Sequence, residues 1–360
     1  NIASDISILV NLTIQNTNSC GASYSVVSNI SNTNRNLNVG GSLIFASTTV
    51  GGSLSFGGGS TFPLTTYVGG DIQMLDSNAT LLGDIVFNGT GVQTMNKTFG
   101  IINAASDWTV NKTSGEVGLG SAWTTLFSGT MNVATGTLRL NNFSYTFATT
   151  TIGASGTLKL HGSETISTTT FSSGSTALYE GTGASCTLKN IAYQNLVIQG
   201  GSTTTLSLPA ALTVSQNLQI NSGTLDVTAS NYGLNVGGNW SNIGTFNARN
   251  GTTTFTGTNQ TITGTTTFYN FVKTVSSADT LTFGAGQTQT ITNNWIVNGV
   301  SGNLLSLRST SNGVQWNVNP QGTRSVSYTN VKDSNNTNVT PVSINGTMVN
   351  AGNNTNWGFD

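Results

Sequence analysis

The sequence predicts an all-β protein, and specifically a right-handed parallel β-solenoid that forms a single elongated domain. The first observation behind this is composition: the 360 residues include 44 Gly but only 4 Pro, and Ser, Thr and Asn dominate the rest. Thr is β-branched and favours strands, while Gly and Asn tolerate the backbone angles of tight turns. The second observation is a set of short recurring phrases, and the third is that no segment has a helical period over 11 residues.

The longest phrase occurs three times, as FNGTGVQTM (Phe87–Met95), YEGTGASCTL (Tyr179–Leu188) and FTGTNQTI (Phe255–Ile262). Each copy has an aromatic residue, any residue, Gly-Thr, a short spacer, and then Thr followed by an apolar residue. Repetition of this kind is expected when every coil of a solenoid is one structural unit. We expect the aromatic residue to lie inside, Gly-Thr to turn the chain, and the final apolar residue to face the core.

Two shorter phrases also recur, and both place a glycine at the start of a strand. Val-Gly-Gly begins the segments Val39–Phe45, Val50–Phe56, Val68–Met74 and Val236–Asn242, and Gly-Thr-Leu begins Gly136–Leu140, Gly156–Leu160 and Gly223–Val227. Short strands between Gly and Asn corners suit a solenoid, in which Asn, Ser and Thr at equivalent corners form ladders. The alternative is an array of β-sandwiches, which requires antiparallel hairpins and a stop every ~100 residues.

The chain divides by these patterns into three parts. We expect residues 1–37 to be an N-terminal strand or cap region with a candidate donor strand, 38–325 to be the solenoid body with degenerate repeats, and 326–360 to be a C-terminal coil or cap. No apolar run approaches the ~18 residues of a membrane helix, so we expect no membrane insertion. The sequence begins at Asn1 without Met, which indicates a processed or excised segment.

Several segments resemble the repeat regions of very large adhesin-like surface proteins of bacteria and archaea. They are GGNW (Gly237–Trp240), SGNLLSLRS (Ser301–Ser309) and the tail with SVSYTNVKDSNNTN and GNNTNWGFD. The resemblance extends over Val39–Asp360 and is clearest from Tyr179 onward. It implies a right-handed parallel β-helix at the cell surface, and it brings no catalytic motif.

Both ends of the sequence are apolar, which predicts self-assembly. In DISILVNLTI the aliphatic residues alternate without a break, so a single strand would have one aliphatic face. That strand would either cover the first coil or be donated to a neighbouring subunit. Trp357 and Phe359 make the tail apolar as well. We therefore predict a homopolymer whose contacts include Ile6, Ile8, Val10, Leu12, Ile14, Trp357 and Phe359.

The predicted function is an extracellular structural subunit that builds a cell-surface filament, sheath or stalk by strand or edge complementation. One alternative is an adhesin segment that binds surface glycans through exposed aromatic residues. Trp108, Trp123 and Trp295 are the candidates, and the sequence is equally compatible with their lying in the core. Ice binding is a further alternative, because outward threonines could order water. It rests on Thr-Thr-Thr tracts at residues 149–151, 168–170, 203–205, 252–254 and 265–267.

We predict no enzyme, no catalytic residues, no cofactor and no metal site. A carbohydrate-active enzyme needs clustered carboxylates, and the nearest approach to a cluster is Asp71, Asp76 and Asp84. The only histidine, His161, stands near Glu164 in a segment that predicts a surface turn. A net charge of −1 gives no electrostatic basis for binding nucleic acid.

The sequence also contains two cysteines and several glycosylation sequons. Cys20 and Cys186 lie far apart in the sequence, and two buried free thiols are favoured over a disulfide. Asn-x-Ser/Thr sequons occur no more often than the composition predicts, so they permit glycosylation without demanding it. The candidate glycosylation sites are Asn11, Asn78, Asn88, Asn111, Asn239 and Asn345.

Overall fold

The chain is an all-β solenoid. The computed structural model describes residues 5–15, 24–27, 35–46, 54–56, 64–77, 79–99, 101–102, 106–123, 128–183, 185–343 and 346–359. These residues form 39 strands and no helix, and parallel strands stack as coils in about 12 turns. Every strand pair with a described register is parallel; in the first unit, for example, Trp108 pairs with Met131 and Met131 with Thr150. The predicted solenoid is confirmed, and an array of antiparallel sandwiches is excluded.

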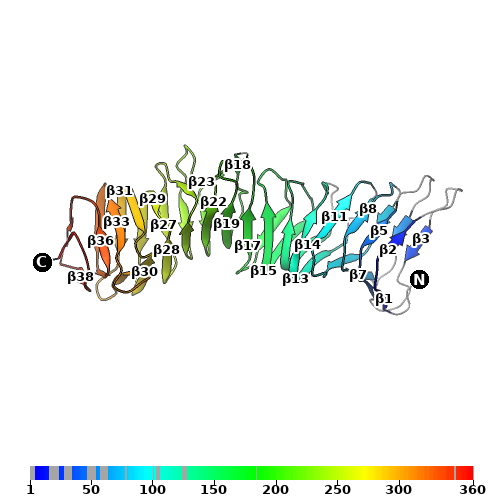
Figure 1. Cartoon of the computed structure of the whole chain (residues 1–360), viewed down its shortest axis with the longest axis horizontal. Coiled ribbons are helices and arrows are strands. Elements are labelled where there is room, and N and C mark those ends of the chain that lie inside the picture. Colours follow the sequence, from blue (N-terminus) through cyan, green and yellow to red (C-terminus); the bar gives the residue numbers. More distant parts are fainter. Residues whose placement is uncertain are drawn as a thin grey trace. The chain divides into compact units, whose positions relative to one another are not determined.

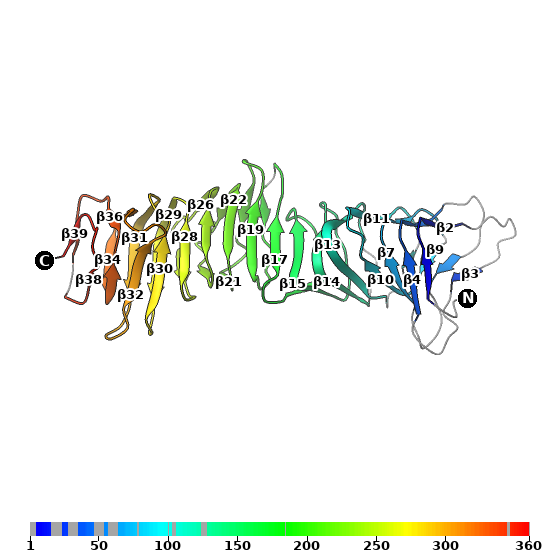
Figure 2. The same ribbon diagram turned by 60° about the horizontal axis from the view of Figure 1, so that its bottom comes forward.

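The first of two compact units comprises Asn1–Ala177. Its strands are β1 (Ile6–Ile8), β2 (Leu12–Ile14), β3 (Tyr24–Val27), β4 (Arg35–Val39), β5 (Leu43–Phe45), β6 (Leu54–Phe56), β7 (Leu64–Val68), β8 (Ile72–Met74), β9 (Ala79–Leu81), β10 (Asp84–Phe87), β11 (Gln93–Lys97), β12 (Ile101–Ile102), β13 (Trp108–Leu119), β14 (Thr130–Arg139), β15 (Thr149–Leu160) and β16 (Thr168–Phe171). Neighbouring strands such as β13, β14 and β15 lie side by side in successive coils (Figures 1 and 2).

The second compact unit comprises Leu178–Asp360. After β17 (Thr176–Tyr179), its strands are β18 (Cys186–Thr187), β19 (Asn195–Gln199), β20 (Thr205–Ser207), β21 (Leu212–Val214), β22 (Leu218–Ser222), β23 (Thr224–Asp226), β24 (Leu234–Val236), β25 (Trp240–Asn242), β26 (Thr245–Asn247), β27 (Thr252–Phe255), β28 (Gln260–Thr263), β29 (Thr266–Thr274), β30 (Asp279–Phe283), β31 (Thr288–Asn298), β32 (Leu305–Ser309), β33 (Trp316–Pro320), β34 (Thr323–Ser327), β35 (Thr329–Val331), β36 (Ser334–Asn336), β37 (Val342–Ser343), β38 (Val349–Asn350) and β39 (Trp357–Gly358). The described residues of both units include no helix that is long and apolar enough to span a membrane.

Coil length varies because segments between strands differ in length. The pairing Ile6↔Leu37 corresponds to 31 residues (37 minus 6), whereas Met131↔Thr150 corresponds to 19 residues (150 minus 131). Extra residues between strands do not disturb the parallel register, since each strand still meets its equivalent one coil later.

The core of each unit is a column of apolar side chains that includes stacked aromatic rings. The aromatic residue of each copy of the long phrase is buried, as predicted, and so is the final apolar residue; they are Phe87, Met95, Tyr179, Leu188, Phe255 and Ile262. Phe283 lies parallel to Trp316 with ring centroids 4.0 Å apart. Trp108, Trp123 and Trp295, for which the sequence leaves surface and core positions open, lie in the core, because at most 1% of each is accessible. Sugar stacking on these three rings is therefore excluded.

The Val-Gly-Gly corners explain why glycine recurs before strands. Gly40 and Gly69 occupy equivalent corners of successive coils, and the amide of each donates to the preceding coil. A Cβ on Gly40 would lie 2.9 Å from the carbonyl oxygen of Leu9, and a Cβ on Gly69 would overlap the carbonyl oxygen of Gly40. Only glycine lets two corners of equal length approach this closely. The Val50 copy of this phrase begins outside the described residues.

The first coil corrects the expectation of one continuous strand from Ile6 to Ile14. The chain instead forms β1 and β2, which a corner at Leu9 and Val10 separates. Both strands pair in parallel with the second coil, β1 with β4 and β2 with β5. Leu9 is 91% exposed and Val10 is 70% exposed, whereas Ile14 is buried. The alternation in the sequence therefore runs through a corner and does not produce one flat aliphatic face.

Replacement of a corner glycine tests the close approach of the coils. We expect Gly69→Ala to lower the free energy of unfolding by about 1–3 kcal/mol, because the added methyl group must displace the backbone of the preceding coil. Gly91→Ala is the matched control, since a Cβ at Gly91 meets no atom within 4 Å. Urea denaturation of both variants measures the difference. Equal stability of the two variants would contradict the stacking of these corners.

Candidate functional site

Polar side chains connect successive corners of the first unit into a ladder. Asn11 Oδ1 accepts a hydrogen bond from the backbone N–H of Ser42 at 2.7 Å. Ser42 Oγ accepts from the N–H of Asp71 at 3.0 Å, and Asp71 Oδ1 accepts from the N–H of Thr94 at 2.7 Å. Each side chain thus satisfies the backbone donor of the equivalent residue one coil later, as the sequence predicts for such corners.

The second unit contains an equivalent ladder built from asparagines. Asn195 Oδ1 accepts from the backbone N–H of Asn217 at 3.2 Å and from its side-chain amide at 3.1 Å. Asn217 Oδ1 accepts from the N–H of Asn239, and Asn239 Oδ1 accepts from the N–H of Thr261, both at 2.8 Å. In both units, therefore, a side-chain oxygen accepts a hydrogen bond from the backbone N–H of the equivalent residue one coil later.

The long phrase has a further role that sequence reasoning missed, because its Gln and Gly bind a buried lysine. In the first unit Gln93 Nε2 donates to the carbonyl oxygen of Val68 at 2.8 Å and to that of Gly70. Gln93 Oε1 accepts from Lys112 Nζ at 2.5 Å, and the same ammonium donates to the carbonyl of Gly89. The phrase thus links a Val-Gly-Gly corner on one side to a lysine on the other.

The copy in the second unit repeats this arrangement. Gln260 Nε2 donates to the carbonyl oxygens of Val236 at 3.0 Å and Gly238 at 2.5 Å. Lys273 Nζ donates to Gln260 Oε1 at 3.0 Å and to the carbonyl of Gly257. We call this arrangement of corner, glutamine and lysine the lysine lock.

The remaining copy, at Tyr179–Leu188, uses threonine in place of lysine. Thr204 is buried, and its hydroxyl donates to the carbonyl of Gly181 at 3.0 Å while it accepts from the N–H of Gly183 at 3.1 Å. In all three copies a buried donor further along the chain therefore binds the carbonyl of the first glycine of the phrase. This shared contact is the structural reason for the repetition.

The two lysine locks differ in charge. Lys273 Nζ lies 2.7 Å from Asp279 Oδ2, and both side chains are 1% exposed. Burial raises the pKa of Asp279, but hydrogen bonds from the N–H of Asn259 and from Lys273 outweigh it, so this pKa lies below its ordinary value. Lys112 has only neutral oxygen partners among the described residues, and burial lowers its pKa.

The three acidic residues considered for catalysis are buried or accept hydrogen bonds from backbone amides. Asp71 is a ladder member, and Asp84 Oδ1 accepts from the N–H of Asp107 at 3.0 Å. Asp76 is buried. In the described part of the chain, no three Asp, Glu, His or Cys side chains gather closely enough to hold a metal ion.

The His161 segment is a turn, as its sequence predicts. Glu164 is buried, and its carboxylate accepts from the N–H groups of His161 at 2.6 Å and Gly162 at 2.7 Å. Glu164 therefore holds the backbone of the turn.

The threonine tracts do not point outward as a whole. In every tract the central threonine is buried and its two neighbours are more exposed; the central residues are Thr150, Thr169, Thr204, Thr253 and Thr266. Outward threonines are in register only locally, with Thr149 beside Thr168 and Thr151 beside Thr170.

Four candidate glycosylation sites lie on exposed, described positions: Asn11, Asn88, Asn111 and Asn239. Asn11 and Asn239 use Oδ1 in the corner ladders. Asn78 and Asn345 lie outside the described residues. Cys186 is a half-buried free thiol, and Cys20 also lies outside the described residues.

The C-terminal aromatic residues are packed within the second unit. Trp357 is 8% exposed, and its ring meets Trp295 edge to face with centroids 5.9 Å apart. Its indole N–H donates to Ser334 Oγ at 3.1 Å, and Phe359 lies parallel to the Trp357 ring. Trp357 is therefore packed in the core of the second unit.

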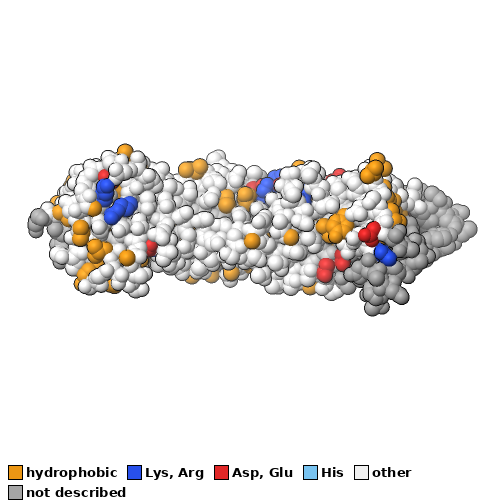
Figure 3. Space-filling model, turned by 90° about the horizontal axis from the view of Figure 1, so that it is seen from below, with side chains coloured by type: hydrophobic (Ala, Val, Ile, Leu, Met, Phe, Trp, Pro, Cys, Tyr) orange, Lys and Arg blue, Asp and Glu red, His pale blue; other side chains and the backbone are white. Residues whose placement is uncertain are grey.

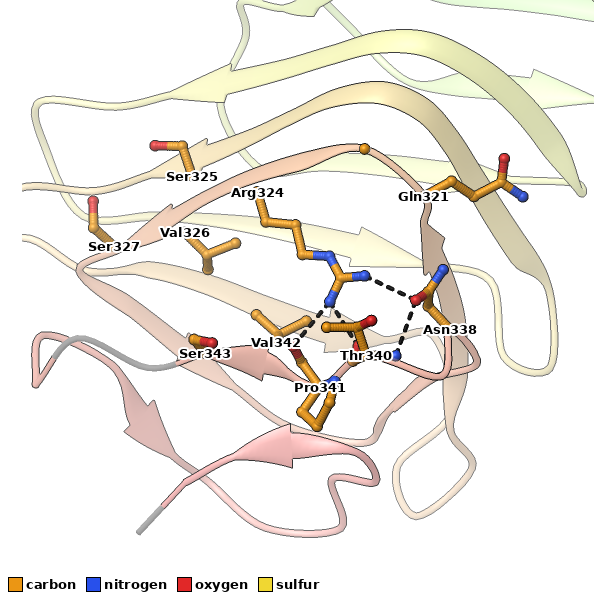
Figure 4. Close-up of a pocket in the computed structure, with 11 residues that line it drawn as sticks. Gln321, Arg324, Ser325, Val326, Ser327, Asn338, Thr340, Pro341, Val342 and Ser343 are labelled. Atoms are coloured by element: carbon orange, nitrogen blue, oxygen red, sulfur yellow. Dashed lines mark hydrogen bonds between the residues drawn. The ribbon is translucent and has the colours of Figure 1, made fainter.

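A polar cavity of about 630 Å³ lies beside β34 in the second unit (Figure 4). Arg324 projects from β34 across this cavity toward the segment that leads into β37. Its Nη1 donates to the carbonyls of Thr340 at 2.6 Å and Pro341 at 2.9 Å. Its Nη2 donates to the carbonyl of Pro320 at 2.6 Å and to Asn338 Oδ1 at 3.0 Å. Nothing in the sequence marks Arg324, because its partners lie in segments on both sides of it that the fold brings together.

Comparisons with known proteins give no name to these arrangements. The chain matches no family model, no curated protein and no solved structure.

Removal of Lys273 tests whether the lysine lock stabilises the second unit. We expect Lys273→Met to lower the free energy of unfolding by about 3–5 kcal/mol, because Asp279 would remain as a buried carboxylate without its counter-charge. Adding Asp279→Asn should recover part of this loss. Chemical denaturation of the two variants checks the expectation. A double variant no more stable than Lys273→Met would contradict the assigned charge pair.

The charge pair also predicts a response to acid. The pKa of Asp279 is lower in the folded protein than the ~3.9 of an unfolded aspartate. Its contribution to stability is therefore present above about pH 4 and is lost as pH falls through the folded-state pKa. We expect the stability difference between wild type and Asp279→Asn to shrink over that acidic range, as measured by denaturation from pH 7 to pH 2. A constant difference across this range would contradict the expectation.

Proposed function

We propose that this chain is a non-enzymatic extracellular structural subunit, which self-assembles into a surface filament, sheath or stalk through pairing of strand edges. The observation that carries the proposal is an unpaired strand edge at β1 and β2 among the described residues. Strands β1 and β2 pair with β4 and β5 on one side, and no described residue pairs with their other side. An unpaired parallel edge offers backbone donors and acceptors to another strand.

Apolar side chains at this edge support the proposal. Ile6 is 39% exposed, Leu9 91% and Val10 70%, all within one short segment. Burial of aliphatic surface is favourable at ~25 cal/mol per Å², so a partner strand would gain from covering them.

The scarcity of charge supports it as well. Only 6% of the residues are charged, and most of the face shown in Figure 3 is neither charged nor hydrophobic. Several charged side chains form ion pairs within the chain, such as Arg139 with Glu116 and Arg249 with Asp226. Little net repulsion therefore opposes association between copies.

The side chains at the Leu9–Val10 corner leave room for a single partner strand beside β1 and β2, but not for a complete coil. In the next two coils the equivalent residues are Gly-Gly, because a Cβ there would collide with the preceding corner. Leu9 and Val10 carry side chains at these positions, so a complete coil with a corner of the same length has no room before them. We infer that a second copy contributes a strand along β1 or β2 and does not continue the stack.

The resemblance to adhesin-like surface repeats fits an extracellular location but leaves glycan adhesion as the second candidate function. The cavity beside Arg324 favours that candidate, since it is polar and large enough for a small ligand.

A charge at the exposed corner tests self-assembly without disturbing the core. We expect wild-type protein to form ordered polymers at neutral pH, and Leu9→Asp combined with Val10→Asp to remain monomeric, because a partner strand would have to cover two carboxylates that have no counter-charge. Electron microscopy and sedimentation measure the two states. Ile8 and Leu12 are less suitable positions, since both are half-buried in the first coil.

Val92→Asp is the matched control, because Val92 is also 70% exposed and also lies at a corner. It should polymerise like the wild type, and circular dichroism should show all three proteins equally folded. Monodisperse wild-type protein, or normal assembly of the Leu9 and Val10 variant, would refute the proposal.

A further inference from the structure

The cavity beside Arg324 combines three features that together suit one class of ligand. Its walls carry hydroxyl and amide groups from Gln321, Ser325, Ser327, Asn338, Thr340 and Ser343. Val326 and Val342 also line the cavity, but both are buried and offer little surface to a ligand. A volume of about 630 Å³ falls within the ~300–1,000 Å³ of ordinary small-molecule sites.

Arg324 brings an uncompensated positive charge to this cavity. Its four hydrogen-bond acceptors are carbonyl and amide oxygens, and none of the described lining residues is acidic. Other cations have carboxylate partners in the described part of the chain, among them Arg139, Lys159, Arg249 and Lys273. Burial lowers the pKa of Arg324, as expected for a cation without a counter-charge. An anion is therefore the missing complement.

The guanidinium is also held in place before any ligand arrives. Four of its five N–H donors are occupied by the turns around residues 320 and 338–341, which leaves the Nε–H without a described partner. A pre-positioned charge loses little side-chain entropy on binding.

We propose that this cavity binds a carboxylated sugar of an anionic polysaccharide, with Arg324 facing the carboxylate. The hydroxyl and amide walls suit sugar hydroxyls, which both donate and accept hydrogen bonds. An acidic peptide shares the carboxylate but lacks the hydroxyl groups for these walls.

Oligogalacturonate is the probe that tests this site in the complete 360-residue chain. We expect titration calorimetry to show binding of oligogalacturonate that weakens with added salt, and no binding of the same oligomer as its methyl ester. Arg324→Gln should weaken binding by about tenfold or more, because a charge-assisted hydrogen bond is lost. Lys332→Gln removes a positive charge from a residue that does not line the cavity, so it should leave binding unchanged.

A second variant separates recognition from stability, since Arg324 also bridges two turns. Ser325→Trp keeps Arg324 and narrows the cavity from an exposed position, so it should abolish binding with little change in thermal unfolding. Equal binding of the methyl ester or of polyglutamate would overturn recognition of an acidic sugar. Absence of binding by the wild type, or full binding by Arg324→Gln, would overturn the site itself. None of these results depends on polymer formation by the chain.

Discussion

The close approach of successive corners is the constraint on which the rest of this structure depends. Parallel strands of neighbouring coils lie ~4.8 Å apart, so the turns between them must also fit within that distance. The chain meets this demand with glycine where backbones touch, as at Gly69, and with Asn, Asp or Ser oxygens where an N–H needs an acceptor. The lysine locks serve the same need inside the coil, at carbonyls that would otherwise be buried without a donor.

The same constraint shapes the proposed function. Polar and acidic side chains at the corners accept hydrogen bonds from backbone amides, as Asp71 and Asp84 do. The surface that remains is nearly uncharged, and it leaves two distinctive regions in the described residues. One is the apolar edge at Leu9 and Val10, which stand where the next two coils have Gly-Gly, and the other is the cavity at Arg324, between β34 and the segment that leads into β37.

Much of the fold could be predicted because the deciding signals are local in the sequence. The buried aromatic residue of each phrase and the Val-Gly-Gly corners need only a few neighbouring residues. The break between β1 and β2 could not be predicted, since Ile8 and Leu12 keep the alternation across the corner. The lysine locks have no fixed spacing, because Lys112 follows Gly89 by 23 residues (112 minus 89) and Lys273 follows Gly257 by 16 (273 minus 257). Burial of Trp108 depends on which face its strand presents, which the sequence does not reveal.

Hydrogen exchange at the corner amides tests the central constraint most directly. The N–H groups of Ser42, Asp71 and Asn239 lie at exposed or half-exposed corners, yet each donates to a side-chain oxygen of the preceding coil. The stacking of corners predicts that these amides exchange as slowly as the amides of the adjoining strands. Exchange at the rate of free loops, with the strands still protected, would contradict the claim that the corners join one coil to the next.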